Sequence, residues 1–155
     1  MTPCINIARK NKIAHTVHEY THDPETESYG SEAAEKLGVA NTQVFKTLVV
    51  SLDTSELVVA VIPVAAMLSL KHIAKTVGAK KAFMANKTDV ERTTGYVLGG
   101  VSPIGQKKRL KTVVDISANH FSTIYISAGR RGLEIELNPA DLAKLTNAVF
   151  AEICQ

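Results

Sequence analysis

Glycine, proline and basic residues gather in the stretch Thr94–Arg109, which is the strongest candidate for a chemical role in this sequence. It contains four of the nine glycines, namely Gly95, Gly99, Gly100 and Gly105. Glycine lets the backbone adopt positive φ and approach a ligand closely, and Pro103 keeps Ser102 out of the helical region. We therefore predict a stiff loop whose outward backbone N–H groups can hold an anion or an acyl oxygen.

The sequence of this loop resembles two familiar motifs but matches neither. Gly100 and Gly105 have the glycine spacing of a phosphate-binding loop, but Gln106 stands where that motif requires lysine. Ser102 lies in a segment one residue too long for a GxSxG nucleophile elbow, and Pro103 disfavours the sharp turn of that elbow. A Ser-His-Asp hydrolase that uses Ser102 and a loop of turns without chemistry remain as alternatives.

Lys46 lies near the start of the apolar segment Val44–Val50. On a strand it shares a face with Leu48 and Val50, so two orientations are open. The ammonium group either points inward over a cavity or snorkels to water at the strand end. An inward ammonium group would bind a phosphate or an ester oxygen.

Histidine and glutamate clusters indicate no further chemistry. His15 and His18 would face opposite sides of a strand, and no HExxH or cysteine spacing accompanies them, so we predict no metal site and no cofactor. Glu134 and Glu136 share one face of a predicted strand. Such a pair usually marks the solvent side of a strand rather than a glycosidase site.

Composition indicates one globular domain over residues 1–155. Apolar residues make up 45% and charged residues 21%, and no run is long enough to span a bilayer. Cys4 and Cys154 stand far apart, and no secretory leader is recognisable, which predicts a cytoplasmic protein. The net charge of +3 is too small to indicate nucleic-acid binding by itself.

Apolar periodicity predicts interspersed helices and strands. Predicted helices cover residues 3–12, 31–37, 69–78, 88–92 and 139–145, the fourth capped by Thr88. Predicted strands cover residues 16–20, 45–52, 56–63, 80–85, 112–116, 123–128 and 133–137, and residues 149–153 form a strand or a helix. The segment Gly129–Gly132 is predicted as a hairpin turn. This order favours a mixed α/β (α+β) domain with a curved, partly barrel-like mixed sheet flanked by helices over a doubly wound parallel sheet.

Three segments, Val44–Leu48, Gly95–Leu110 and Ile124–Leu133, resemble the YbaK/EbsC family, and the resemblance extends over nearly the whole chain, including Met1–Pro3 and Tyr20–Pro24. It implies a freestanding editing domain related to the insertion domain of prolyl-tRNA synthetases. It further implies a trans-editing deacylase for Cys-tRNA(Pro) and Cys-tRNA(Cys), with prolyl-tRNA synthetase as a transient partner. In this family the substrate thiol is thought to attack its own carbonyl, so the reaction is formally lyase-like rather than hydrolytic. A deacylase for another amino acid, such as Ala-tRNA(Pro), and a non-catalytic module that binds an aminoacyl or nucleotide end remain alternatives.

Site residues follow from the resemblance position by position. The residues implied in catalysis are Lys46, Gly100, Val101 and Ser102. The residues implied in substrate binding are Tyr20, Tyr29, Thr47, Gly99, Ser127, Gly129 and Glu134, with Glu134 standing where the family has aspartate.

Basic residues predict contacts with tRNA phosphates, although a solvated basic face is the commoner fate of any one lysine. The candidates are Lys80, Lys81, Lys107, Lys108, Arg109, Lys111, Arg130 and Arg131.

Overall fold

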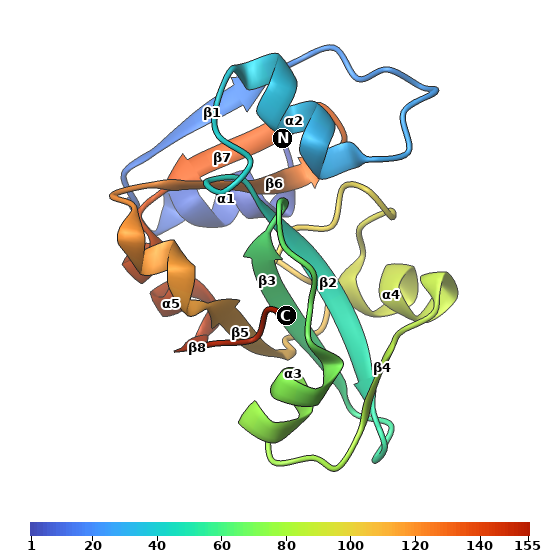
Figure 1. Cartoon of the computed structure of the whole chain (residues 1–155). Helices are drawn as coiled ribbons and strands as arrows, with labels where there is room; N and C mark the ends of the chain where they lie inside the picture. Colours follow the sequence, from blue (N-terminus) through green and yellow to red (C-terminus); the bar gives the residue numbers. More distant parts are fainter.

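A computed structural model describes residues 1–155 and contains five α-helices, a short 3₁₀-helix and eight strands (Figure 1). The helices are α1 (Pro3–Lys10), α2 (Tyr29–Leu37), α3 (Leu70–Thr76), α4 (Lys87–Thr94) and α5 (Pro139–Thr146), with the 3₁₀-helix η1 (Ile116–His120). The strands are β1 (His15–Glu19), β2 (Phe45–Leu52), β3 (Leu57–Pro63), β4 (Ala82–Met84), β5 (Lys111–Asp115), β6 (Ile124–Arg130), β7 (Leu133–Leu137) and β8 (Val149–Ala151). No helix has the length and apolar character needed to cross a membrane.

Most helices begin where the sequence predicts. Thr2 caps α1 and Asn138 caps α5, each followed by proline at the first helical position. The cap predicted at Thr88 is wrong, because the Oδ1 atom of Asn86 accepts the N–H of Asp89 at 2.8 Å and α4 begins one residue earlier. Asparagine is at least as good a cap as threonine, so both residues carry the same sequence signal.

The strands form two sheets rather than one. The larger has the order β4-β2-β3-β5-β8, in which the predicted β2–β3 hairpin is antiparallel while β5 runs parallel to β3 and β8. The smaller is antiparallel, in the order β1-β7-β6, with the predicted turn between β6 and β7. A bridge between Val44 and Tyr125 joins the sheets at one corner. The predicted mixed α/β class is therefore confirmed, but the strands form two sheets in place of the single predicted one, and neither closes into a barrel.

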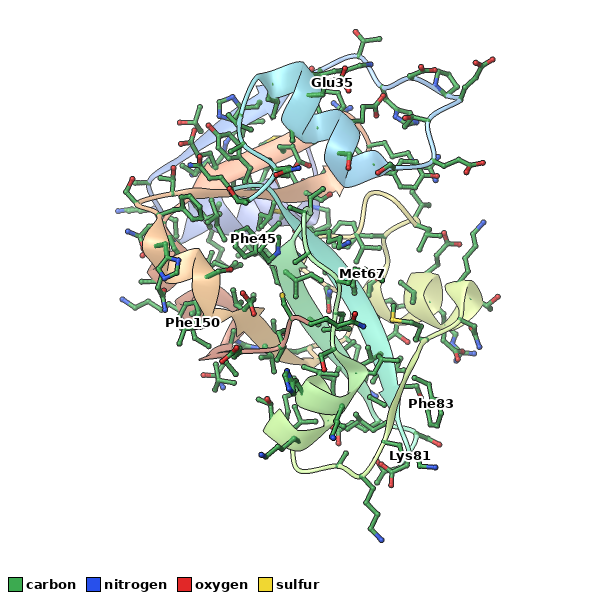
Figure 2. All side chains as sticks on the ribbon, in the orientation of Figure 1. Glu35, Phe45, Met67, Lys81, Phe83 and Phe150 are labelled. Carbon is green, nitrogen blue, oxygen red and sulfur yellow. The ribbon has the colours of Figure 1, made fainter.

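Two apolar cores follow from the alternation of residues along the strands. The larger lies between the sheets, where Phe45 and Val49 of β2 pack with Ile126 of β6, Ile135 of β7 and α1 (Figure 2 labels Phe45 in the interior). The smaller lies on the other face of β2 and β3, which α3 covers. Helix α2 packs on the remaining face of the smaller sheet, through Ala33, Ala34 and Tyr125.

One part of the larger sheet has an unpaired edge. Strand β4 pairs only with residues 50–52 of β2, and on that side the start of β2 is adjoined only by the bridge between Val44 and Tyr125. Val44 and Leu52 both bond backbone to backbone across the β2–β3 hairpin. Since bonding directions alternate along an antiparallel strand, Phe45 and Thr47 direct their N–H and C=O groups away from β3. This edge of β2 is where the candidate site forms.

Candidate active site

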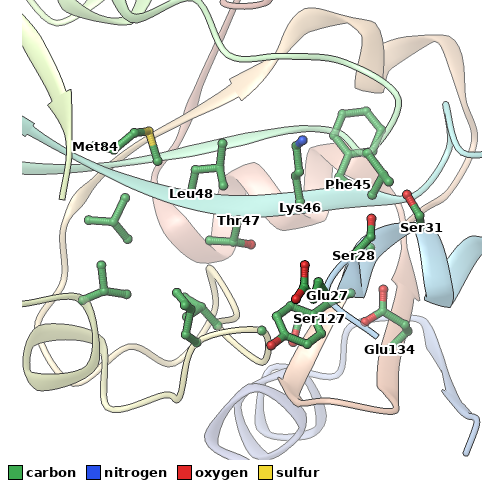
Figure 3. A pocket seen from close by; sticks show the side chains of 18 of the residues that line it. Glu27, Ser28, Ser31, Phe45, Lys46, Thr47, Leu48, Met84, Ser127 and Glu134 are labelled. Carbon is green, nitrogen blue, oxygen red and sulfur yellow. The ribbon is translucent and has the colours of Figure 1, made fainter. Parts of the chain in front are cut away.

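A pocket of about 390 Å³ opens at the unpaired edge of β2 (Figure 3). Its walls come from β2, the segment leading into α2, the loop after α4, and the strands β6 and β7. Small-molecule sites have this size and this mixture of apolar walls with a few polar groups. The pocket can therefore enclose a small molecule or the end of a larger ligand.

Eight of the residues predicted for catalysis or substrate binding line this pocket, although they are spread over more than a hundred positions of the chain. They are Tyr20, Tyr29, Lys46, Thr47, Gly99, Val101, Ser127 and Glu134.

Three further predicted site residues do not line the pocket. Gly100 donates its N–H to the carbonyl of Val97 at 2.9 Å, and a Cβ at that position would lie 2.7 Å from the Cα of Arg130. Gly129 packs in the β6–β7 turn, where a Cβ would lie 2.9 Å from Thr2. Both glycines thus serve close backbone packing behind the pocket wall.

Ser102, the third of them, is fully buried on the side of the loop that faces the core. Its hydroxyl oxygen accepts the N–H of Ile104 at 3.2 Å, and its neighbour is the thiol of Cys4. Burial raises the pKa of the Cys4 thiol to about 11. The hydroxyl of Ser102 therefore has no path to a substrate in the pocket, which corrects any direct side-chain role for this residue.

Lys46 lines the pocket as a half-buried side chain. It projects from the side of β2 that also carries Leu48, while Thr47 projects from the other side (Figure 3). No carboxylate oxygen lies within 4.0 Å of its ammonium group, and it makes no hydrogen bond within the protein. The pocket lining thus includes a lysine whose ammonium group has no protein partner, which is costly unless a ligand or water supplies one.

Glu134 is a buried carboxyl group in the pocket wall, with 6% of its surface exposed. Burial raises its pKa to about 8, and no hydrogen bond or cation within the protein offsets that effect. The expectation that Glu134 and Glu136 mark a solvent-facing side is wrong, because α2 covers this face. Glu136 instead accepts from Thr123 at 2.6 Å and lies 2.9 Å from the Nε2 atom of His18.

Several hydrogen-bonding groups at the pocket have no partner within the protein. The N–H groups of Gly99 and Val101 donate to no backbone or side-chain acceptor. The Oγ1 atom of Thr47 is buried and unpaired. Buried polar groups normally have partners, so unpaired groups that share one pocket indicate a ligand that supplies them.

Sequence reasoning missed the contribution of α2. Glu27, Ser28 and Ser31 line the pocket because the helix starts at Tyr29 rather than at the predicted residue 31. Ser28 is the N-cap residue, but its side chain makes no cap hydrogen bond. The sequence signal for the start of this helix is ambiguous, because Ser28 and Ser31 are equally good N-cap residues.

The pocket wall contains no histidine and no cysteine. His15, His18 and His22 lie elsewhere and contact the carbonyl of Ile13, Glu136 and Glu32, respectively. The pocket therefore holds no pair of a nucleophile and a histidine base of the kind that hydrolases use.

None of the basic residues predicted to bind tRNA lines the pocket. Arg130 and Arg131 lie in the β6–β7 turn beside the glycine loop, whereas Lys107 and Lys108 follow that loop and bond to the end of α4. Lys81 bonds to Asp53 beyond the far end of β2, about 23 Å from Lys46 at the rise of an extended strand. Figure 2 shows Lys81 at the opposite end of the molecule from Glu35 of α2.

Comparison with known proteins agrees with this geometry. Residues 23–145 match the model of the aminoacyl-tRNA editing domain family. The chain is 41% identical over 152 residues to an Enterococcus faecalis protein named "Putative Cys-tRNA(Pro)/Cys-tRNA(Cys) deacylase EbsC", covering 98% of this chain and 92% of that one. It is 29% identical over 125 residues to the uncharacterized Bacillus subtilis protein YwhH, covering 80% of this chain and 79% of that one.

Solved structures show the same fold. A hypothetical protein matches with a TM-score of 0.88 at 25% identity over 99% of this chain and 100% of its own. A structure described as "a putative trans-editing enzyme for prolyl tRNA synthetase" matches with a TM-score of 0.84 at 21% identity, over 100% of this chain and 99% of its own, which shows the fold alone. Together with the sequence matches, these likenesses show that the chain belongs to the family of aminoacyl-tRNA editing domains of the YbaK/EbsC type.

Proposed function

We propose that the whole chain acts as one editing domain in the cytoplasm, which releases cysteine wrongly attached to tRNA(Pro). The observation that carries the proposal is the content of the pocket. Its lining has an unpaired ammonium group and free backbone donors, but no cysteine and no histidine that could form a nucleophile–histidine pair. Such a pocket suits a reaction in which the protein orients an activated ester and the substrate supplies the nucleophile.

The ammonium group, the buried carboxyl group and two backbone donors of the pocket each have a role in this proposal. Lys46 binds the phosphate of the terminal adenosine or the ester oxygen, because it is a cation without a protein partner. Glu134 accepts a hydrogen bond from the α-ammonium group of the amino acid. The positive charge of that group would lower the pKa of the carboxyl group and favour its ionised form. The N–H groups of Gly99 and Val101 donate to the carbonyl oxygen as negative charge develops on it.

The reaction we propose is a cyclisation of the substrate. The cysteine thiol loses its proton to solvent, its sulfur bonds to the ester carbonyl carbon, and the bond from that carbon to the ribose oxygen breaks. The ribose oxygen takes up a proton, so the products are a cyclic thiolactone and free tRNA. An aminoacyl ester needs a smaller rate acceleration than a peptide bond, so positioning and charge stabilisation suffice.

Support for the substrate comes from the relative in Enterococcus faecalis, whose name specifies Cys-tRNA(Pro) and Cys-tRNA(Cys). Since the pocket is too small to contact much of a tRNA, a partner that recognises tRNA(Pro) would supply selectivity. We propose a transient complex with prolyl-tRNA synthetase for that role.

The deciding experiment is a panel of deacylation assays on purified protein with Cys-, Ser-, Ala- and Pro-tRNA(Pro). We expect rapid release from Cys-tRNA(Pro) alone, because the hydroxyl of serine is a weaker nucleophile than a thiol and alanine has none. Equal rates with Cys- and Ser-tRNA(Pro) would exclude participation of the thiol. Preference for Ala-tRNA(Pro) would identify a hydrolase for another amino acid, and binding without turnover would identify a non-catalytic module.

A further inference from the structure

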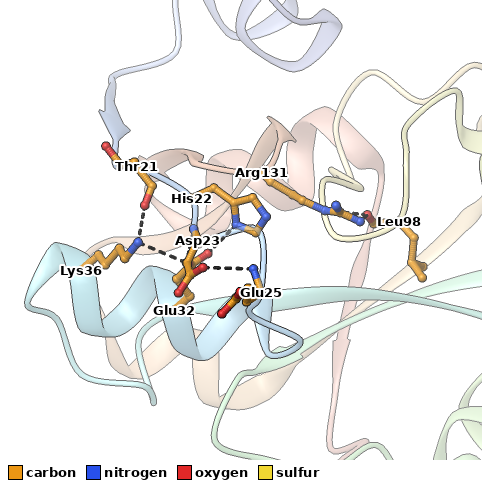
Figure 4. A network of polar contacts seen from close by, with 8 residues as sticks. All are labelled: Thr21, His22, Asp23, Glu25, Glu32, Lys36, Leu98 and Arg131. Carbon is orange, nitrogen blue, oxygen red and sulfur yellow. Dashed lines mark hydrogen bonds and ion pairs between the residues drawn. The ribbon is translucent and has the colours of Figure 1, made fainter.

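Arg131, predicted to contact tRNA phosphate, has an exposed side chain whose guanidinium group nevertheless bonds within the protein. Its Nε and Nη2 atoms donate to the carbonyl oxygen of Leu98 at 3.2 and 2.7 Å (Figure 4). The same group lies over the ring of Tyr29, 4.4 Å from the ring centroid. Leu98 and Tyr29 both line the pocket, so one side chain joins two of its walls.

The contact is tight enough to set the spacing of these walls. Gly99 has a φ of +89°, and a Cβ there would lie 2.6 Å from the Nε atom of Arg131 and 2.8 Å from the ring of Tyr29. The glycine loop, the start of α2 and the β6–β7 turn therefore meet at a single point. The unpaired N–H group of Gly99 lies at this point of the loop.

A second network, which includes His22 and Glu32, also contacts Tyr29. The ring of His22 lies 5.8 Å from that of Tyr29, and its Nδ1 atom is 2.7 Å from the Oε1 atom of Glu32 (Figure 4). Although burial opposes ionisation of Glu32, hydrogen bonds from His22, Asp23 and Lys36 hold the pKa of its carboxyl group below its ordinary value. The start of α2 is thus anchored, so Arg131 fastens the loop to a fixed support.

We propose that Arg131 is a positioning residue that holds the glycine loop against Tyr29, so that the N–H groups of Gly99 and Val101 stay directed at the reacting carbonyl. It acts through the loop and not through contact with tRNA. A planar guanidinium group can donate two hydrogen bonds to one carbonyl while stacking on an aromatic ring, and a lysine ammonium group cannot. The catalytic part of this inference rests on the proposed function, whereas the part that concerns the position of the loop applies to the free protein.

Arg130 provides a matched comparison in the same turn. It carries the same charge, is exposed, and has only Glu19 near its guanidinium group, at 4.0 Å. If Arg130 contacts a phosphate, Arg130→Ala should raise the tRNA concentration needed for half-maximal rate and weaken the salt dependence of binding. Arg130→Lys should keep both near their wild-type values, because lysine carries the same charge. If Arg131 positions the loop, Arg131→Ala should lower the rate at saturating tRNA, and Arg131→Lys should lower it as well.

The experiment compares Arg131→Ala, Arg131→Lys, Arg130→Ala and Arg130→Lys in single-turnover deacylation of Cys-tRNA(Pro) at two salt concentrations. We expect both Arg131 variants to lower the saturating rate about 10- to 100-fold, the cost typical of a misplaced reacting group, with the salt dependence unchanged. A wild-type saturating rate for Arg131→Lys, or a weaker salt dependence for Arg131→Ala, would overturn the proposal in favour of a phosphate contact.

Hydrogen exchange of the free proteins gives a readout that needs no substrate. Both Arg131 variants should exchange the hydrogen-bonded amides of Leu98 and Gly100 faster than either Arg130 variant, while the amides of the β6–β7 ladder stay protected. Unchanged exchange of these two amides would overturn the proposal even where activity falls. If wild-type protein leaves Cys-tRNA(Pro) intact, the proposed function fails, and the exchange comparison alone decides the role of Arg131.

Discussion

At the scale of single residues, the pocket contains two ionisable groups without protein partners, Lys46 and Glu134. Removing the first should remove the activity. We expect Lys46→Met to lower the rate of Cys-tRNA(Pro) deacylation by at least about 100-fold, as loss of a charge that stabilises the reacting centre usually does. Lys71→Ala, a change at an exposed lysine of α3 outside the pocket, is the control. A Lys46→Met protein within twofold of the wild-type rate would contradict the proposed role.

Ser102 leads to the opposite expectation. Because its hydroxyl group is buried and bonded to the N–H of Ile104, Ser102→Ala should keep a rate within a few-fold of wild type. Loss of that hydrogen bond should cost about 1 kcal/mol of unfolding free energy. Abolished turnover in a folded Ser102→Ala protein, or an acyl-enzyme trapped on Ser102, would restore the serine hydrolase alternative.

Glu134 should make stability depend on pH. Its pKa is about 8 in the folded protein against an ordinary value of 4.5, so between these values the folded state holds a proton that the unfolded state has lost. The unfolding free energy contributed by this group therefore falls as pH rises from about 5 to about 8, by up to about 1.4 kcal/mol per pH unit.

Glu134→Gln should abolish that slope, and its advantage over wild type should grow with pH. Urea denaturation at pH 5, 6.5 and 8 measures the effect, with Glu35→Gln on the exposed side of α2 as the control. A constant difference between wild type and Glu134→Gln across this range would show that Glu134 is already ionised at pH 5.

At the scale of elements, the site depends on the backbone of the glycine loop. Gly99 and Gly38 both have positive φ, at +89° and +69°, but only Gly99 is surrounded by other atoms. Alanine at Gly38 should cost about 1 kcal/mol for the left-handed backbone alone. Alanine at Gly99 must also displace Arg131 or Tyr29, so we expect a larger loss of stability and loss of deacylation. Thermal unfolding and activity of the two variants test this, and equal effects would contradict it.

The partial pairing of β2 is the second feature at this scale. Its composition predicts the strand and its hairpin with β3, because both segments are rich in Val and Leu and a short polar turn joins them. Nothing in that pattern predicts that β4 stops after three residues and leaves one edge of the first half of β2 without a partner strand. The site forms at this edge, so a feature of strand pairing rather than of composition decides where the ligand can enter.

At the scale of the whole molecule, the net charge of +3 is too small to bind tRNA without clustering of basic residues. Lys80 and Lys81 lie at the far end of β2, so they test how far tRNA extends over the protein. If both contact phosphates, the double variant Lys80→Ala/Lys81→Ala should reduce the slope of log affinity against log salt by about 1.4 to 1.8. An unchanged slope would confine tRNA to the end of the molecule that carries the pocket.

Local patterns and motifs were enough to predict the mixed α/β class, the β2–β3 hairpin, most helix caps and the family. The sequence also identified eight residues that line the pocket, through the resemblance rather than through their spacing. It placed Gly100, Ser102 and Gly129 in the site as well, because adjacent residues in a motif look equivalent until the chain is folded.

Contacts between distant segments establish which side of the loop faces the ligand, and they separate the roles of Arg130 and Arg131. The side on which a side chain lies depends on what packs against it. Glu134 is buried because α2 covers its face of the small sheet, and the exposed Arg131 bonds within the protein because Leu98 and Tyr29 meet beside it. These contacts join positions far apart in the chain, and local sequence patterns carry no information about them.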